Sequence, residues 1–163
     1  TSLSNGQNFI TIQEEQRHIE SYLKIQQFRY QDTLAYNIDI DKALYNFTIP
    51  KLLLQPLVEN ALVHGIRGKR GKGRISVTGR LEGGNIVFCV TDDGVGMDEE
   101  KLYNLRKASV AGTTQSANIA AFGVGNVNER IHIYYGENYG LFFKSQPDVG
   151  TTARVLIPAR NVS

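Results

Sequence analysis

Three short segments of this 163-residue chain combine polar side chains and glycines in patterns typical of ligand-binding sites. The first, Leu54–Gly65, reads LQPLVENALVHG and contains Asn60 and His64, which share one face of a helix because they are four residues apart. Glu59 lies on the neighbouring face. The side-chain oxygen of Asn60 suits Mg²⁺, and His64 can donate a hydrogen bond to phosphate oxygens. Taken alone, these residues also fit a polar patch on a surface helix.

Residues 90–97 (VTDDGVGM) form the second segment and directly follow an alternating strand pattern. The carboxylate of Asp92, at the end of that strand, can accept a hydrogen bond from a ring amine. Gly94 and Gly96 allow the backbone to approach a ligand closely. The segment alone fits a tight acidic turn equally well.

The third segment, 122–127 (FGVGNV), places Gly123 and Gly125 just before an expected helix. Free backbone N–H groups at the start of a helix favour an anion such as phosphate. An entropic hinge is the alternative interpretation of these two glycines.

Several other kinds of site are excluded by spacing. The basic stretch Gly68–Arg74 (GKRGKGR) lacks the spacing and the Ser or Thr of a P-loop. Gly123–Asn128 lacks the third glycine of the dinucleotide-binding fingerprint. The three histidines and the single cysteine, Cys89, show no zinc-ligand spacing.

Composition predicts one globular domain, with 41% hydrophobic and 21% charged residues. One cysteine cannot form an intrachain disulfide, and no apolar run approaches the roughly 20 residues that a membrane span needs. The net charge is +2, but much of the positive charge lies in Arg67–Arg74, so a nucleic-acid footprint over the whole protein is not expected. Since the chain starts at Thr1 and its only methionine is Met97, we expect a fragment of a longer protein.

Periodicity predicts the elements that must position the three segments. A capping box, Thr11–Glu14, opens a helix over about 11–31, and Pro56 should kink or restart a second helix over Lys51–Gly65. Cys89 should be buried in its strand, and His18 solvated on its helix. Further expected elements are strands at 36–40, 74–82, 85–92, 140–145 and 151–157, and helices at 98–107 and 126–135.

The order of these elements indicates an α+β fold with a core over about 34–158. We expect a two-layer sandwich: a mixed, mostly antiparallel sheet covered on one face by helices. Gly83-Gly84 should form the turn of a hairpin. The uncharged stretch Ala108–Asn128 is expected to be mobile as far as Phe122.

The order and spacing of the three segments resemble the ATP-binding domain shared by histidine kinases, gyrase-type ATPases and MutL, the Bergerat-type fold. The residues of four longer stretches point to a narrower family. IPKLLLQPLVENALVHG, VTDDGVGM, GNVNERIHIYYG and DVGTTARVLIP are similar to the catalytic domain of sensor histidine kinases of the LytS/YesM type. The resemblance covers about residues 11–158.

This resemblance implies that Asn60 holds Mg²⁺ against the phosphates of ATP, with His64 also at the nucleotide. Asp92 would accept a hydrogen bond from the adenine amino group, and Thr151 would lie near the adenine. Glu59 would lie close to the γ-phosphate, as a base or a positioning group for the acceptor.

Glycines and a lid complete the implied site. Gly94 and Gly96 would let the base and sugar approach the backbone. The loop residues Gly123, Val124, Gly125 and Asn126 would cover the phosphates, and 97–122 would be a lid that orders over the nucleotide.

Two positions depart from the family pattern. Gyrase-like ATPases carry a water-activating Glu where this chain has Pro56, which favours phosphate transfer to a separate nucleophile over hydrolysis. Against the usual lid-loop pattern G-x-G-L-x-N-V, Ala121 replaces the first glycine and Val124 the leucine.

The implied activity is that of a protein-histidine kinase in a two-component system. The γ-phosphate would pass to a histidine on an upstream dimerisation domain, and from there to a response regulator. The acceptor is expected outside this chain, because His18, His64 and His132 lack the P-H-F surroundings of the family. The parent is expected to be a membrane-anchored homodimer with this domain in the cytoplasm.

Three alternatives stay open. An anti-sigma-type serine kinase on the same fold would phosphorylate a serine of a small protein instead. A degenerate interaction module would fail to bind Mg·ATP. Nucleic-acid binding through Arg67–Arg74 is the weakest alternative, because that loop has no aromatic residue to stack on bases.

Overall fold

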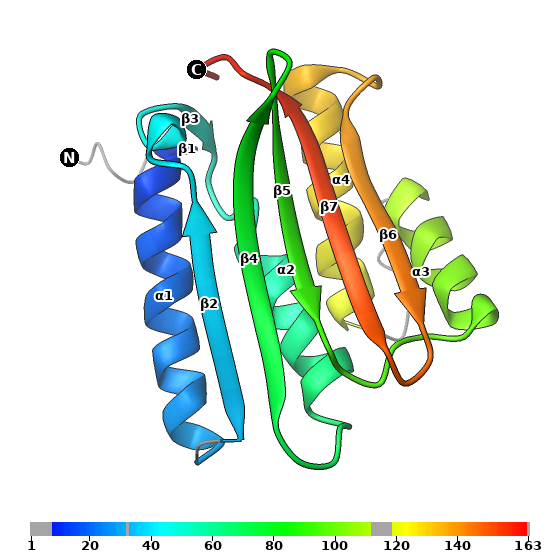
Figure 1. Cartoon of the computed structure of the whole chain (residues 1–163). Coiled ribbons are helices and arrows are strands. Elements are labelled where there is room, and N and C mark those ends of the chain that lie inside the picture. The colour runs from blue at the N-terminus through cyan, green and yellow to red at the C-terminus, as the bar shows by residue number, and fades with distance from the viewer. Residues whose placement is uncertain (1–7, 32, 112–118, 163) are drawn as a thin grey trace.

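A five-stranded sheet with helices on one face forms the molecule (Figure 1). The computed structural model describes residues 8–31, 33–111 and 119–162. The strand order is β2-β4-β5-β7-β6, in which only the pair β2–β4 is parallel. The strands are β2 (Leu34–Ile40), β4 (Gly73–Glu82), β5 (Asn85–Asp92), β6 (Gly140–Gln146) and β7 (Gly150–Pro158). The predicted mixed, mostly antiparallel sheet is confirmed.

The first helix, α1 (Ile12–Arg29), begins with the predicted capping box, in which Thr11 and Glu14 satisfy each other's backbone N–H groups. Its inner stripe is fully buried at Ile12, Ile19 and Leu23. A short strand that the sequence did not predict, β1 (Phe9–Thr11), precedes it and pairs with β3 (Thr48–Pro50). Three residues are too few for an alternating pattern to be recognised.

The strand β5 carries the second sequence segment to the end of the sheet. The hairpin β4–β5 turns at Gly83 and Gly84, whose φ angles of 55° and 84° fit the predicted tight turn. Alternation along β5 buries the side chain of Asp92 on the helix-covered face together with Phe88. Cys89 lies on the opposite face and is only half-buried, so its predicted burial is wrong in degree.

The predicted second helix begins later than expected, as α2 (Gln55–Asn60) with Pro56 in its first turn. Proline is tolerated there, because an N–H at that position would have no helical partner. The chain continues as one π-helical stretch, η3 (Ala61–Ile66), and Arg67 N–H closes the wide turn on the carbonyl of Leu62 at 2.9 Å. A short 3-10 helix, η2 (Lys42–Leu44), precedes β3.

The third segment is helical, which corrects the predicted loop. Helix α4 (Ile119–Tyr135) begins seven residues before the expected start at Asn126 and includes Gly123 and Gly125. Val124, Val127 and Ile131 are buried at helical spacing, and this packing outweighs the cost of about 1 kcal/mol for each helical glycine.

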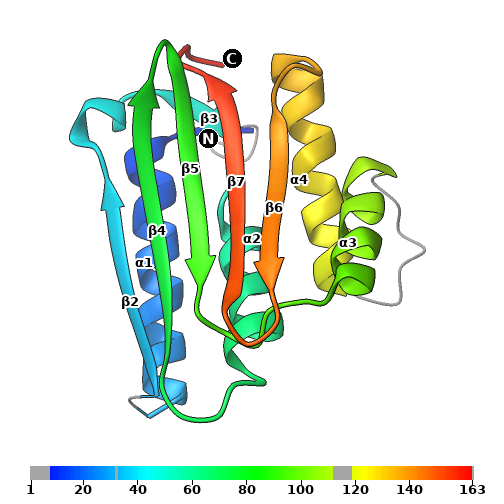
Figure 2. The same ribbon diagram turned by 45° about the vertical axis from the view of Figure 1, so that its right-hand side comes forward.

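The predicted helix at 98–107 is also longer in the structure, as α3 (Glu99–Ala111). The stretch expected to be mobile is therefore helical at 108–111 and 119–122, and its residues 112–118 lie outside the described part. Figures 1 and 2 place α1, α2 and α4 side by side on one face of the sheet, with α3 beyond α4 next to β6. The first sequence segment, in α2 and η3, therefore contacts both the strand β5 that carries the second segment and the helix α4 that carries the third.

Candidate functional site

Asp92 is a buried carboxylate at the end of β5, with 4% of its surface exposed. The backbone N–H of Gly94 donates to its Oδ1 at 2.9 Å. Burial raises the pKa of this carboxyl to about 6, although the N–H groups of Gly94 and Thr151 lower it. Asp92 thus offers an acceptor in a low-dielectric place, where a matching donor on a ligand gains most.

Glycines surround Asp92 because no larger residue fits. A Cβ on Gly65 would lie 2.4 Å from Asp92 Oδ1, and a Cβ on Gly94 would lie 2.2 Å from the Gly65 carbonyl. Gly150 has φ +139°, and its Cβ would lie 2.0 Å from the Asp92 carbonyl oxygen. The η3 backbone can therefore approach the end of the strand directly, and Val95 N–H bonds to the Gly65 carbonyl at 3.1 Å. We call these three glycines the glycine cage.

The loop after Asp92 is fixed on both sides. Asp93 accepts the backbone N–H of Arg74 at 2.7 Å and pairs with Lys69 at 3.3 Å. Gly96 has φ +68°, and its Cβ would lie 2.0 Å from the Gln146 carbonyl oxygen. The predicted requirement for glycine at Gly94 and Gly96 therefore has a steric cause inside the protein as well.

Thr151 pairs with Asp92 in the β5–β7 register, so the two predicted adenine-end residues are neighbours. Its Oγ1 lies 2.7 Å from the Oγ of Ser145, which also accepts the N–H of Met97 at 2.8 Å. Sequence reasoning missed Ser145, because a lone serine near the end of a strand carries no motif.

The first segment presents Asn60 at the last position of α2, with 7% of its surface exposed. No residue in the described part of the chain makes a hydrogen bond to its side chain, so the amide oxygen is available to a ligand. Glu59 is half-buried and accepts from Gln55 Nε2 at 3.3 Å. The pKa of Tyr22 on α1 is raised, first by burial and then by the negative charge of Glu59. Glu59 therefore lies on the side of α2 that faces α1. His64 is half-buried in η3.

The segment before α2 is held by two residues that the sequence analysis missed. Glu15 of α1 is fully buried and accepts the backbone N–H groups of Leu52, Leu54 and Gln55 at 3.2, 2.9 and 3.3 Å. Arg130 of α4 donates to the carbonyls of Lys51 and Leu52. A signal for Glu15 existed, since it lies three residues after Ile12 and four before Ile19 on the buried stripe.

The third segment lies in the first turns of α4, with Val124 in the core and Asn126 exposed. Part of the predicted lid, 112–118, is outside the described residues. The expected phosphate contacts of Gly123, Val124, Gly125 and Asn126 therefore stay a prediction.

The donor set around Asn60 fits a metal that is held mainly by a ligand. Within 8–31, 33–111 and 119–162, no group of three or more His, Cys, Asp or Glu residues could hold a metal ion. Mg²⁺ characteristically keeps few protein ligands and completes its shell with substrate phosphates and water. The single amide oxygen of Asn60 suits that chemistry.

Comparison with known families decides the class of the domain. The model of the histidine kinase-, DNA gyrase B- and HSP90-like ATPases matches residues 48–161. The chain belongs to this ATPase family. Family membership makes ATP its nucleotide, and the predicted resemblance is confirmed.

Relatives of this ATPase domain include sensor histidine kinases and a sensor protein. It is 33% identical over 160 residues to the sensor histidine kinase YesM of Bacillus subtilis, and the aligned region is 98% of this chain and 26% of the relative. It is 29% identical over 161 residues to the sensor histidine kinase BtsS of Escherichia coli, with the same two shares. It is 30% identical over 155 residues to the sensor protein LytS of Staphylococcus haemolyticus, which covers 95% of this chain and 26% of the relative. The chain thus spans about a quarter of each relative.

Solved structures confirm the fold. The nucleotide-free catalytic domain of the histidine kinase ThkA matches with a TM-score of 0.67 at 15% identity, over 93% of this chain and 95% of that one. The mycobacterial sensor histidine kinase MprB matches with a TM-score of 0.62 at 15% identity, over 94% and 97% of the two chains. Among the described helices, none is both long and apolar enough to cross a membrane.

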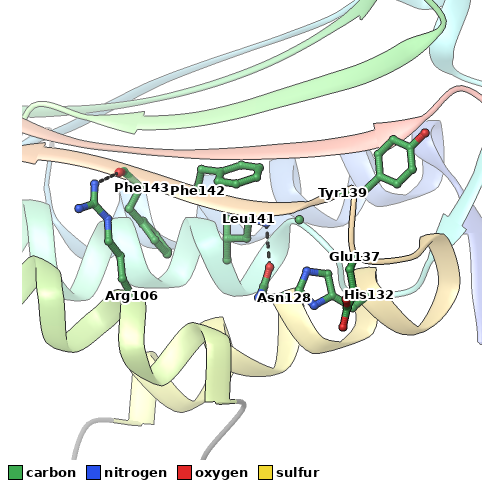
Figure 3. Close-up of a pocket in the computed structure, with 9 residues that line it drawn as sticks. Arg106, Asn128, His132, Glu137, Tyr139, Leu141, Phe142 and Phe143 are labelled. Carbon is green, nitrogen blue, oxygen red and sulfur yellow. Dashed lines mark hydrogen bonds between the residues drawn. The ribbon is translucent and has the colours of Figure 1, made fainter.

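One cavity of the ATPase domain, of about 370 Å³, is lined by Asp92, Ser145 and Thr151. A second cavity, of about 420 Å³, lies between α3, α4 and the edge strand β6 (Figure 3). Arg106 donates to the Phe143 carbonyl at 2.6 Å, and the Asn128 Oδ1 accepts the Leu141 N–H at 2.9 Å. These two side chains satisfy backbone groups that the edge strand directs away from β7. His132 lines the same cavity. These two polar contacts join parts of the protein to each other.

Proposed function

We propose that this ATPase domain binds Mg·ATP and serves as the catalytic domain of a sensor histidine kinase. The γ-phosphate of the bound ATP would pass to a histidine on an upstream dimerisation domain of the same parent protein, and then to a response regulator. Membership of the ATPase family and the names of the relatives support this function.

The observation that carries the proposal is the buried carboxylate of Asp92 inside the glycine cage. Adenine presents an amino group where guanine presents a carbonyl oxygen. A carboxylate accepts from the former and repels the latter, and burial strengthens this discrimination. Thr151 and Ser145 add hydroxyl groups beside Asp92 for the rest of the base.

Asn60 would hold Mg²⁺ through its amide oxygen. The metal, when bound, neutralises charge on the phosphates and so favours phosphoryl transfer. Glu59 is the candidate group that orients the incoming nucleophile, and His64 is a candidate hydrogen-bond donor to the phosphate oxygens. Pro56 stands where a water-activating carboxylate would be needed, which favours transfer to a protein nucleophile over hydrolysis.

The acceptor and the partners lie beyond this chain, which spans about a quarter of its curated relatives. The names of those relatives support a phosphoacceptor domain, a response regulator and a membrane-anchored parent. A homodimeric parent would bring the domain to a partner histidine. His18 is exposed on α1, as expected of a solvated helical residue.

Titration calorimetry of the purified chain tests the proposal. ADP and a non-hydrolysable ATP analogue should bind, should bind more tightly with Mg²⁺, and should be preferred over GTP. Transfer from ATP should then occur to a supplied phosphoacceptor domain, and Asn60→Asp should lose transfer more than nucleotide affinity. Absence of binding would favour the degenerate interaction module, and transfer to serine would favour the serine kinase.

A further inference from the structure

Helix α2 begins without a cap of its own. No side chain at its start accepts the first free N–H groups, and Pro56 supplies none. Glu15, which lies 37–40 residues earlier in the chain, accepts the N–H groups of Leu52, Leu54 and Gln55 instead. A cap that is normally local therefore comes from another helix.

The same short segment is held from its other side. Arg130 donates to the carbonyls of Lys51 and Leu52, from the helix that also contains the third sequence segment. Leu52 has φ +60°, a left-handed conformation that costs a non-glycine residue on the order of 1–2 kcal/mol. The Leu52 N–H bonds to Glu15, and its carbonyl to Arg130. This pair of contacts stabilises the strained turn.

We infer that Glu15 is a positioning residue that fixes the start of α2 and thereby the place of Asn60 relative to Asp92. The inference rests on the proposed role of Asn60 as the metal ligand. Asn60 lies at the end of α2, about 8 Å along the helix from the capped start. A short helix transmits displacement of its start to its end, and an error of about 1 Å in a positioned group is costly for phosphoryl transfer.

Glu15→Gln is the variant that tests this role. Glutamine has nearly the same shape, but its amide nitrogen would face N–H donors in place of an accepting oxygen. Glu20→Gln is the matched control, because Glu20 lies on the same helix and is exposed. Three quantities are measured for each: ADP affinity without Mg²⁺, ADP affinity with Mg²⁺, and the thermal unfolding midpoint.

We expect Glu15→Gln to reduce the gain in ADP affinity on adding Mg²⁺ by about tenfold, with Mg²⁺-free affinity within about twofold of wild type. Glu20→Gln should leave all three quantities unchanged. A full Mg²⁺ gain in folded Glu15→Gln would overturn the inference. Equal losses with and without Mg²⁺, together with a lowered midpoint, would also overturn it, because they indicate a purely structural role.

A second variant decides the case in which Glu15→Gln does not fold. Arg130→Gln loosens the other side of the same turn, and should reduce the Mg²⁺ gain in the same direction; an unchanged gain overturns the inference. Asn60→Ala separates this test from that of the function. If Mg²⁺ does not increase the ADP affinity of the wild type, the role of Asn60 as a metal ligand is refuted. If Asn60→Ala abolishes this increase and Glu15→Gln retains it, only the positioning role of Glu15 is refuted.

Discussion

Two buried carboxylates lie in the part of this domain that the structure describes, and their surroundings differ. Glu15 uses both oxygens on three backbone N–H groups of one turn, with Arg130 on the far side of that turn. Asp92 accepts the backbone N–H groups of Gly94 and Thr151 and lies against glycines where side chains would otherwise be. Three N–H groups from one turn hold the first acid, whereas the second lies in a setting so close that only glycine backbone fits around it.

The difference indicates how to tell a structural buried charge from a binding one. A carboxylate whose oxygens are fully used fixes the elements that it joins. Asp92 keeps a pKa raised to about 6, because burial outweighs its N–H partners. Its carboxylate therefore gains from a further donor, and a ligand can supply one.

The largest expected effect comes from filling the glycine cage. Gly65→Ala places a Cβ 2.4 Å from Asp92 Oδ1, so the carboxylate or η3 must shift. We expect roughly a 100-fold loss of ADP affinity, measured by calorimetry. Gly68→Ala is the control, because its Cβ would meet only Val95 at an ordinary 3.5 Å. Equal affinities of the two variants would contradict the importance of the cage.

Asp92→Asn should have the next largest effect. It should weaken ADP binding by at least about tenfold and remove the preference over GDP, since the amide no longer supplies a charged acceptor. The fold should remain, because the Asn oxygen can still accept from Gly94. Retained ADP affinity in a folded variant would refute the role of Asp92 in reading adenine.

The same variant, Asp92→Asn, should also change the free energy of unfolding, in a direction that the pKa of Asp92 predicts. The folded pKa of Asp92 lies above its ordinary value, so ionisation destabilises the fold as pH rises from about 4 to 6. Asp92→Asn escapes this loss and should be more stable than wild type at pH 7.5, by up to about 3 kcal/mol. Urea unfolding should show the difference shrinking towards zero near pH 4.

A smaller effect is expected from pH alone. ADP affinity should fall by about tenfold between pH 7 and pH 5, because protonation of Asp92 with its pKa of about 6 removes the charged acceptor. Inorganic triphosphate lacks the base and serves as the control for titration of the phosphates. A fall of equal size for both ligands would exclude Asp92 as its cause.

Asn128 should show the smallest effect on the ligand. Its Oδ1 is used by Leu141 N–H in the second cavity, which resembles the case of Glu15 (Figure 3). Asn128→Ala should lower the free energy of unfolding by about 1–3 kcal/mol and leave ADP affinity unchanged. The exposed Asn104 on α3, changed to Ala, should alter neither. A change in ADP affinity with Asn128→Ala would connect the second cavity to the nucleotide.

Local patterns predicted most of the sheet and the positions of the motifs. Alternation and Gly83-Gly84 defined the β4–β5 hairpin, and Thr11 with Glu14 defined the start of α1. Asp92 was predicted at the end of a strand, and its burial follows from alternation with Phe88. These features depend on neighbours in the chain, which the sequence displays directly.

Features that depend on distant partners were missed or wrong. The start of α4 is decided by burial of Val124 against the core, which outweighs two glycines that favour a loop. The role of Glu15 depends on a turn near Leu52, and the cage depends on contact between Gly65 and Asp92. Sequence spacing gives no measure of such approaches.

The one parallel pair in the sheet bears on the order in which the domain folds. Strands β4 and β5 join through a two-residue turn, whereas β2 and β4 meet only after the chain between them, which contains α2, has crossed over. Closing that longer loop costs more entropy and is slower. We therefore expect Asp92 to belong to an early hairpin and Asn60 to a later crossover. The two residues proposed to bind the metal and the adenine would then come together only when the last part of the sheet closes.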